Sequence, residues 1–376
     1  MLAENYHSAI VEKIKTENFT FQSGRLTVHL AREFGFCYGV DRAVDYAYQT
    51  RERFPDRGVF LTGEIIHNPH VNDKLRSMGI QFLDRAPGAV DRLSDNDVVI
   101  LPAFGVTVAM LQQLDKRGCT LIDTTCGSVL NVWKNVKRYA DGGYTSVIHG
   151  KVWHEETQAT ASQAVEYGGR YLVVFDKAEA DFVCRFIRGG GSSSAFLDKF
   201  RHAASPGFDP ERDLQRVGLA NQTTMLMSES LEIGEMLRMA VLDRYGSLET
   251  RYQAFDTICS ATQDRQDAVV TLLRERPVDL MLVIGGYNSS NTCNLARICA
   301  GSRPTFHIAD PECLVSIDTI RHRPVGTKQE VVTSGWLRPS GPVTVGLTSG
   351  ASTPDNLVGA AIARLEGFVS TGPPVS

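Results

Sequence analysis

The stretch Gly35-Phe36-Cys37-Tyr38-Gly39-Val40-Asp41-Arg42-Ala43-Val44 places a cysteine between two glycines. It follows a strand-like run at residues 26–30 and opens a helix-like run that continues to about residue 54. Glycine adopts backbone conformations that other residues resist and lets the chain approach a bulky group closely. A cysteine at such a turn lies near a helix N-terminus, which favours the thiolate. The stretch is typical either of a metal-cluster ligand or of a small buried residue in a tight turn.

The same junction occurs twice more along the chain. Asp123-Thr124-Thr125-Cys126 ends one strand-like run, Asp256-Thr257-Ile258-Cys259 ends another, and a helix-like run follows each. Strands and helices alternate through most of the sequence, which indicates parallel sheets covered by helices. We therefore predict an α/β fold of three similar α/β units, each presenting one cysteine toward a shared centre.

The predicted domain boundaries follow this alternation. We expect an N-terminal arm at 1–24, α/β domains at 25–125, 126–255 and 256–355, and a C-terminal helix and tail at 356–376. A Gly/Ser-rich run at 189–194, with the polar residues up to about 215, predicts a flexible surface insertion in the second domain. A length of 376 residues agrees with two or three domains.

Composition limits the classes of function. Hydrophobic content of 43% and charged content of 22% are ordinary for a globular protein with a sizeable core. The net charge of -4 argues against a nucleic-acid-binding protein, which is usually basic. No apolar run reaches membrane-spanning length, and residues 1–23 lack the apolar core of a signal peptide. We expect a cytoplasmic protein that binds neither nucleic acid nor a membrane.

The eight cysteines are widely and irregularly spaced. The absence of a CxxC pair disfavours a zinc ribbon or a thioredoxin motif, and a disulfide scaffold is unexpected in so long a chain. Cys37, Cys126 and Cys259 occupy corresponding turns. The others, which we interpret as structural, are Cys119, Cys184, Cys293, Cys299 and Cys313.

Polar clusters follow many of the predicted strands. Ligands of open α/β sheets bind outside the carboxyl ends of strands, which is where these clusters stand. They are His67 and the segments 124–126, 154–157, 222–224, 288–291 and 349–355. Serine, asparagine and free backbone N–H groups at a helix N-terminus bind anions such as phosphate, although the same residues are ordinary N-caps. The shared position is more informative than any single cluster.

One of these clusters carries a candidate proton donor. Glu156 follows His154 by two residues, and a carboxyl near a metal and a diphosphate suits general acid catalysis. Glu155 competes with Glu156 on position alone. Thr223 or Thr224 would hydrogen-bond that carboxyl or a substrate hydroxyl. The alternative is a surface glutamate and a threonine that caps a helix.

Together these motifs resemble the 4-hydroxy-3-methylbut-2-enyl diphosphate reductase (LytB) family, the last enzymes of the methylerythritol phosphate route to isoprenoids. The matching stretches occur in the family's order and are 35–43, 66–68, 123–126, 154–157, 221–224, 259–262, 288–291 and 349–355. Each stretch is short, but the ordered set covers about residues 25 to 365 and is highly specific.

The resemblance implies a trefoil of three α/β domains with parallel sheets around one central [4Fe–4S] cluster. Cys37, Cys126 and Cys259 match the cluster ligands, and three thiolates leave one iron without a protein ligand. The implied reaction is reductive dehydroxylation of (E)-4-hydroxy-3-methylbut-2-enyl diphosphate to isopentenyl and dimethylallyl diphosphate. An electron donor protein such as ferredoxin or flavodoxin is implied as the partner.

The resemblance also assigns roles around the substrate. Glu156 matches the family's proton donor, and Thr223 matches its partner near the substrate hydroxyl. The residues that match the diphosphate-binding set are His67, His154, Ser289, Ser290, Asn291 and Ser352. Two departures stand out. Many bacterial members have histidine in place of Phe104, and the family usually has proline after Cys126, where this chain has Gly127-Ser128. The phenylalanine and the Gly/Ser run resemble the plant and cyanobacterial branch.

Two other classes of protein fit three cysteines. A three-cysteine [4Fe–4S] dehydratase or a quinolinate-synthase-like enzyme needs no external electrons, so consumption of a reduced donor distinguishes it. A non-enzymatic iron–sulfur sensor would have no use for the anion-type loops at 288–291 and 349–355, so diphosphate binding distinguishes it.

Overall fold

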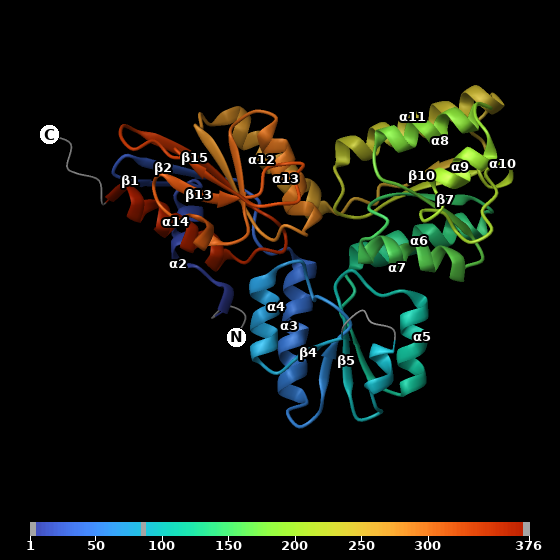
Figure 1. Cartoon of the computed structure of the whole chain (residues 1–376), viewed down its shortest axis with the longest axis horizontal. Helices are drawn as coiled ribbons and strands as arrows, with labels where there is room; N and C mark the ends of the chain where they lie inside the picture. Colours follow the sequence, from blue (N-terminus) through green and yellow to red (C-terminus); the bar gives the residue numbers. More distant parts are fainter. Residues whose placement is uncertain (1–4, 84–87, 371–376) are drawn as a thin grey trace. The chain divides into compact units, whose positions relative to one another are not determined.

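The structure is a computed structural model that describes residues 5–83 and 88–370 (Figure 1). Residues 1–4 of the predicted arm, 84–87 of the first predicted domain and 371–376 of the predicted tail lie outside the described residues. The chain forms two compact units. The first comprises Met1–Asp45, Ile66–Lys74 and Ser260–Ser376, and the second comprises Tyr46–Ile65 and Leu75–Cys259.

Within the described residues, the first unit is built on a five-stranded sheet in the order β1-β2-β15-β11-β12 (Figure 1). Its strands are β1 (Thr20–Ser23), β2 (Leu26–Leu30), β15 (Val343–Ser349), β11 (Leu280–Ile284) and β12 (Thr305–Ile308). All neighbours are parallel except β1 and β2. A hairpin of β13 (Thr319–His322) and β14 (Val331–Ser334) and a short 3-10 helix η2 (Pro311–Cys313) complete this unit.

Helices cover both faces of this sheet, which is why β11 is apolar at every position. Leu282 and Ile284 pack with α2 (Ala9–Thr16) and α14 (Asp355–Ser370) on one face. Met281 and Val283 pack with α12 (Ser260–Glu275) and α13 (Ser290–Ala300) on the other. Because β2, β15, β11 and β12 run parallel, their C-terminal ends lie at the same end of the sheet, where the loops after β11 and β15 begin.

Two features of the first unit differ from the predicted boundaries. β2, which we grouped with residues up to 125, pairs with β15 instead, with Leu26 opposite Val343. The predicted arm is no separate segment either, because β1 pairs with β2 and Val11 is fully buried. Strand pairing over more than 300 residues is not encoded in local periodicity, so the sequence pattern located these strands without their partners.

The described part of the second unit contains two four-stranded parallel sheets, ordered β4-β3-β5-β6 and β10-β9-β7-β8. The strands are β3 (Val59–Leu61), β4 (Gln81–Phe82), β5 (Val98–Leu101), β6 (Thr120–Asp123), β7 (Thr145–His149), β8 (Arg170–Val174), β9 (Val217–Asn221) and β10 (Tyr252–Ala254). The helices are η1 (Ala89–Arg92), α5 (Val108–Arg117), α6 (Gly127–Asp141), α7 (Glu155–Glu166), α8 (Lys177–Ile187), α9 (Ser193–Lys199), α10 (Pro210–Asp213) and α11 (Met227–Tyr245). Helices α3 (Tyr38–Arg53) and α4 (Pro69–Ser77) have residues in both units. The predicted α/β class is confirmed.

The Gly/Ser-rich segment is not the flexible surface insertion that its composition predicts. It forms α9 and α10, and Phe196, Phe200 and Phe208 are almost fully buried against the core of α8 and α11. The ring centroids of Phe196 and Phe200 are 4.8 Å apart. The glycines form a short connection, whereas Ser192 is the N-cap of α9 and accepts from the Ala195 N–H, and the next two serines begin the helix.

Phe196→Ala is expected to destabilise the protein by about 3–5 kcal/mol, because it removes a buried ring and leaves a cavity. The free energy of unfolding in denaturant measures this loss. Leu197→Ala is the matched control, since Leu197 is 39% exposed and its replacement should cost about 0.5 kcal/mol or less. Equal losses for the two variants would contradict the packing of α9 into the core.

All eight cysteines lie in the described residues and are free thiols. Among those residues no helix combines the length and the apolar character that crossing a bilayer requires.

Candidate functional site

Three cysteines stand immediately before helices, as the sequence predicts. Cys37 precedes α3, Cys126 is the N-cap of α6, and Cys259 precedes α12. The Cys37 carbonyl accepts the first helical hydrogen bond of α3, from the Asp41 N–H at 2.9 Å. All three thiols are partly exposed, whereas Cys184, Cys299 and Cys313 are buried. Partial exposure leaves each sulfur accessible to a group bound from outside the chain.

The shared Asp-Thr-X-Cys pattern has a shared physical basis. The backbone N–H of Thr125 donates to Asp123 Oδ1 at 2.8 Å, and that of Ile258 donates to Asp256 Oδ1 at 3.2 Å. In both cases an aspartate forms a turn with the residue two positions later and thereby sets the direction of the following cysteine. The Gly127-Ser128 departure leaves this turn intact, since Cys126 N also donates to the Ala103 carbonyl at 2.8 Å.

The second unit buries the predicted acid and holds it in place. Glu156 is 3% exposed in the first turn of α7. Its Oε1 accepts from the Thr223 backbone N–H at 2.6 Å, and its Oε2 accepts from Thr223 Oγ1 at 3.1 Å. One threonine thus fixes both carboxylate oxygens. Glu155, the competing acid, is less buried.

His154 is the N-cap of α7, and its Nδ1 accepts from the Glu156 backbone N–H at 3.2 Å. A neutral ring that accepts through Nδ1 carries its proton on Nε2, so Nε2 is a hydrogen-bond donor. Phe104 packs edge-on against this ring with centroids 6.0 Å apart. The phenylalanine that replaces the bacterial histidine therefore supports His154 by packing.

Short chains of contacts join two cysteines to Glu156 within the second unit. Cys259 N donates to the Thr223 carbonyl at 3.2 Å, and Thr223 holds the Glu156 carboxylate. Cys126 N donates to the carbonyl of Ala103, whose neighbour Phe104 contacts His154. Hydrogen bonds and ring packing thus connect Cys126, Cys259, Thr223, Glu156 and His154 within the second unit.

The first unit brings the remaining polar clusters together at the ends of β11 and β15. Ser352 Oγ donates to the His67 carbonyl at 3.3 Å and lies 3.4 Å from Ser289 Oγ. The Ser352 carbonyl in turn accepts from Asn68 Nδ2 at 2.8 Å. Ser289 is the N-cap of α13, and Ser290 is 2% exposed in its first turn. These residues bring several hydroxyls together at a helix N-terminus, a position where anions bind favourably.

Asn291 carries the clearest sign of a missing ligand. It is 3% exposed, and its Oδ1 accepts from the Ala351 N–H at 2.9 Å, which fixes the amide orientation. Its Nδ2 has no hydrogen-bond partner in the described chain. A buried donor left without a partner costs about 1–3 kcal/mol, so this position suits a hydrogen-bond acceptor from outside the chain. The Ala351 carbonyl accepts from Cys37 N at 3.2 Å, which connects this cysteine to the group.

Close packing of these loops requires glycine at two positions. A Cβ on Gly286 would meet the His67 carbonyl at 2.5 Å, and one on Gly350 would overlap the Thr292 side chain. His307 supports the same loop through Nε2, 2.9 Å from the Gly285 carbonyl. Burial lowers the pKa of His307 to about 4, so its ring is neutral at pH 7 and its Nε2–H donates to that carbonyl.

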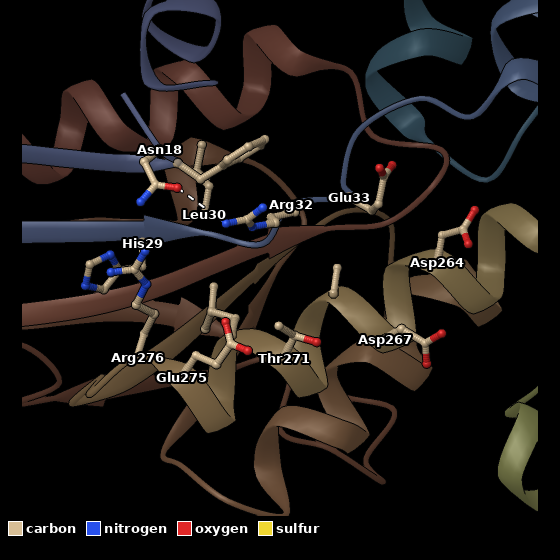
Figure 2. A pocket seen from close by; sticks show the side chains of 13 residues that line it. Asn18, His29, Leu30, Arg32, Glu33, Asp264, Asp267, Thr271, Glu275 and Arg276 are labelled. Atoms are coloured by element: carbon tan, nitrogen blue, oxygen red, sulfur yellow. Dashed lines mark hydrogen bonds between the residues drawn. The ribbon is translucent and has the colours of Figure 1, made fainter. Parts of the chain in front are cut away.

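Two cavities lie away from these residues. One of about 280 Å³ in the first unit, shown in Figure 2, is lined by the end of β2, by Arg32 and Glu33 and by one face of α12. Another of about 580 Å³ lies in the second unit against α5 and α7. Neither cavity contains a predicted catalytic, substrate-binding or cluster-binding residue.

Sequence reasoning missed several residues that hold the site. Asn68, Thr257 and Asn221 are the main examples, since Thr257 Oγ1 accepts from both Asn221 N and Asn221 Nδ2 at 2.8 and 3.0 Å. All three stand inside motifs that the sequence analysis quoted, but they received no role of their own there.

These features define a class of protein. It is an α/β protein in which one unit gathers hydroxyl and amide groups at a helix N-terminus, and the other holds a buried carboxyl whose hydrogen-bond partner also contacts the backbone of a cysteine. The model of the family described as LytB protein matches residues 28–366, and the chain belongs to this family.

Curated relatives agree with the family. The chain is 49% identical to the 4-hydroxy-3-methylbut-2-enyl diphosphate reductase of Gloeobacter violaceus, over 97% of this chain and 88% of that one. It is 46% identical to the enzyme of that name from Nostoc sp., over 98% and 92%. The predicted resemblance, including its cyanobacterial branch, is confirmed.

Solved structures show the same fold. One, of (E)-4-hydroxy-3-methyl-but-2-enyl diphosphate reductase, described as the terminal enzyme of the non-mevalonate pathway, has a TM-score of 0.56 and 27% identity, with 90% of this chain and 99% of that chain covered. The E-1-hydroxy-2-methyl-but-2-enyl-4-diphosphate reductase of Plasmodium falciparum has a TM-score of 0.65 at 21% identity, with 92% and 88% covered, and supports the fold alone.

Proposed function

We propose that this protein reduces (E)-4-hydroxy-3-methylbut-2-enyl diphosphate to isopentenyl and dimethylallyl diphosphate, the final step of the methylerythritol phosphate pathway. Family membership and the names of relatives up to 49% identical support this reaction. The structural observation that carries it is the buried, unpartnered Asn291 Nδ2 beside the hydroxyls of Ser289 and Ser352. A donor group of this kind suits a diphosphate and would serve no purpose in an iron–sulfur sensor.

We further propose that Cys37, Cys126 and Cys259 hold one [4Fe–4S] cluster per chain. The donor set fits such a group, since all three are partly exposed cysteines at helix N-termini and none forms a disulfide. When bound, the cluster supplies single electrons and an iron that three thiolates leave without a protein ligand. The cytoplasm is the proposed compartment, because reducing conditions keep these thiols available.

The remaining roles concern the chain's own donors and its acid. We assign the diphosphate oxygens to Asn291 Nδ2, to the side chains of His67 and His154 and to the hydroxyls of Ser289, Ser290 and Ser352. Glu156 would deliver a proton at the substrate hydroxyl, while Thr223 holds the carboxyl and contacts the substrate. The reaction consumes two electrons and two protons and releases water, so we also propose an electron donor protein such as ferredoxin or flavodoxin.

The decisive experiment is an anaerobic assay of purified protein with the hydroxymethylbutenyl diphosphate and a reduced donor. Both products should form, and two electrons should be consumed for each substrate converted. Turnover without consumption of the reduced donor would favour a dehydratase. Failure of the iron-loaded protein to bind any diphosphate would favour a sensor.

Asn291→Asp is expected to weaken diphosphate binding. The aspartate still accepts from Ala351 N, but it loses the Nδ2 donor and adds a negative charge. Loss of a hydrogen bond to a charged group costs about 1.5–3 kcal/mol, which predicts an affinity at least about 10-fold lower. Calorimetric titration of the anaerobic protein with inorganic diphosphate measures it. Asn294→Ala, one turn further along α13, is the control that should bind normally; equal affinity of the aspartate variant would remove Asn291 from the binding set.

A further inference from the structure

Arg265 in α12 is a buried cation that holds the turn before Cys37. It is 4% exposed, and its Nη2 donates to the Gly35 carbonyl at 2.8 Å. Its Nη1 donates to the Ala261 carbonyl at 2.7 Å, and its Nε has no partner in the described chain. The guanidinium is therefore fixed two residues from the thiol by bonds to neutral carbonyls only.

The backbone at Gly35 depends on this support. Gly35 has φ +76°, a conformation that favours glycine, and a Cβ there would overlap Asp355 Oδ1. The Gly35 N–H donates to Ser349 Oγ at 2.9 Å, while its carbonyl accepts from Arg265. Hydrogen bonds hold both the N–H and the carbonyl of Gly35. Arg265 therefore helps to set the direction in which the chain continues from Gly35 to Cys37.

No carboxylate within the described residues pairs with Arg265. Its neighbours Asp264 and Asp267 are exposed and line the cavity of Figure 2 together with Glu33 and Glu275. Successive residues of a helix are about 100° apart around its axis, so Arg265 projects from a different side of α12.

One acid in contact with this turn, Asp355, already has a cationic partner. Asp355 Oδ1 lies against Gly35, and Asp355 Oδ2 pairs with Lys15 Nζ at 2.9 Å. Burying a single ion without a partner of opposite charge costs several kcal/mol of folding free energy. The uncompensated guanidinium therefore indicates that negative charge is bound close to the Cys37 turn.

We propose that Arg265 is a positioning residue for Cys37 and that its buried charge raises the reduction potential of the iron–sulfur cluster. This inference rests on the proposed cluster. A cubane cluster with three thiolates carries net negative charge, and reduction adds one more negative charge. A cation buried nearby, where the effective dielectric constant is low, stabilises the reduced form more than the oxidised form.

The test uses three variants of the full chain, purified anaerobically. Arg265→Gln removes the charge, Arg265→Lys retains it, and Arg274→Gln is the control on the same helix. The Arg274 side chain is 70% exposed and paired with Glu275. Iron and sulfide analysis gives the loading, and a redox titration followed by electron paramagnetic resonance gives the midpoint potential.

For Arg265→Gln we expect the ratio of reduced to oxidised cluster at a fixed potential to fall about tenfold, a shift of about 59 mV for one electron. Arg265→Lys should stay close to wild type, and Arg274→Gln should not change. A loaded glutamine variant with an unaltered potential would overturn the inference. If that variant loads no cluster, Arg265→Lys decides: loading supports the role of the charge, and loss of loading in both variants refutes it. A wild-type protein without any iron–sulfur signal would instead defeat the proposed cluster itself.

Discussion

Replacing Cys126 with serine is expected to abolish the iron–sulfur cluster and all reductase activity while leaving the fold intact. Serine is a favourable N-cap, so the start of α6 should form as it does with Cys126. The backbone bond from this position to the Ala103 carbonyl needs no side chain. What is lost is the thiolate, for which a hydroxyl is a poor substitute at neutral pH. Iron and sulfide analysis, with circular dichroism for the fold, measures both halves of the prediction.

The same result is expected for Cys37→Ser and Cys259→Ser, since both residues also precede helices. Cys293→Ser is the matched control. Cys293 lies within α13, where its Sγ donates to the Tyr287 carbonyl at 3.3 Å and contacts Arg323 Nη2 at 2.8 Å. It should keep a full complement of iron. Full iron content in any of the other three variants would rule that cysteine out as a ligand.

The features that could be predicted from the sequence are local ones. The Asp-Thr-X-Cys turns are made within four residues, and the aspartate that forms each turn is visible in the motif. The N-cap of α13 is likewise local, because Ser289 Oγ accepts from the Thr292 N–H three residues further on. These segments fold as the sequence predicts because their deciding contacts lie between residues near one another along the chain.

The features that could not be predicted depend on distant partners. Arg265 and Gly35 are 230 positions apart, and nothing in either segment indicates that they meet. The pairing of β2 with β15 is another such contact. The prediction for the Gly/Ser-rich segment was wrong for a different reason. It relied on the glycines and serines and gave too little weight to Phe196, Phe200 and Phe208. Three phenylalanines in a polar stretch were the available signal that it packs into a core.

Replacing Glu156 with glutamine is expected to stop turnover while cluster and substrate binding persist. Glutamine has the same shape, and its Oε1 can still accept from Thr223 N. Its amide can donate to Thr223 Oγ1, which then acts as acceptor. The second unit should therefore retain its contacts. The single lost property is a transferable proton, and general acid catalysis contributes about 10²- to 10⁴-fold to a rate.

The rate under anaerobic assay should accordingly fall by about 10²- to 10⁴-fold, with iron content and diphosphate affinity near those of wild type. Glu155→Gln is the neighbouring control, because Glu155 is less buried and the carboxylate that accepts from Thr223 is that of Glu156. Its turnover should change only a few-fold. Normal activity in Glu156→Gln would assign proton delivery to another group. A parallel loss of affinity would instead show that Glu156 acts by shaping the site, since a group that only supplies a proton leaves ground-state binding unchanged.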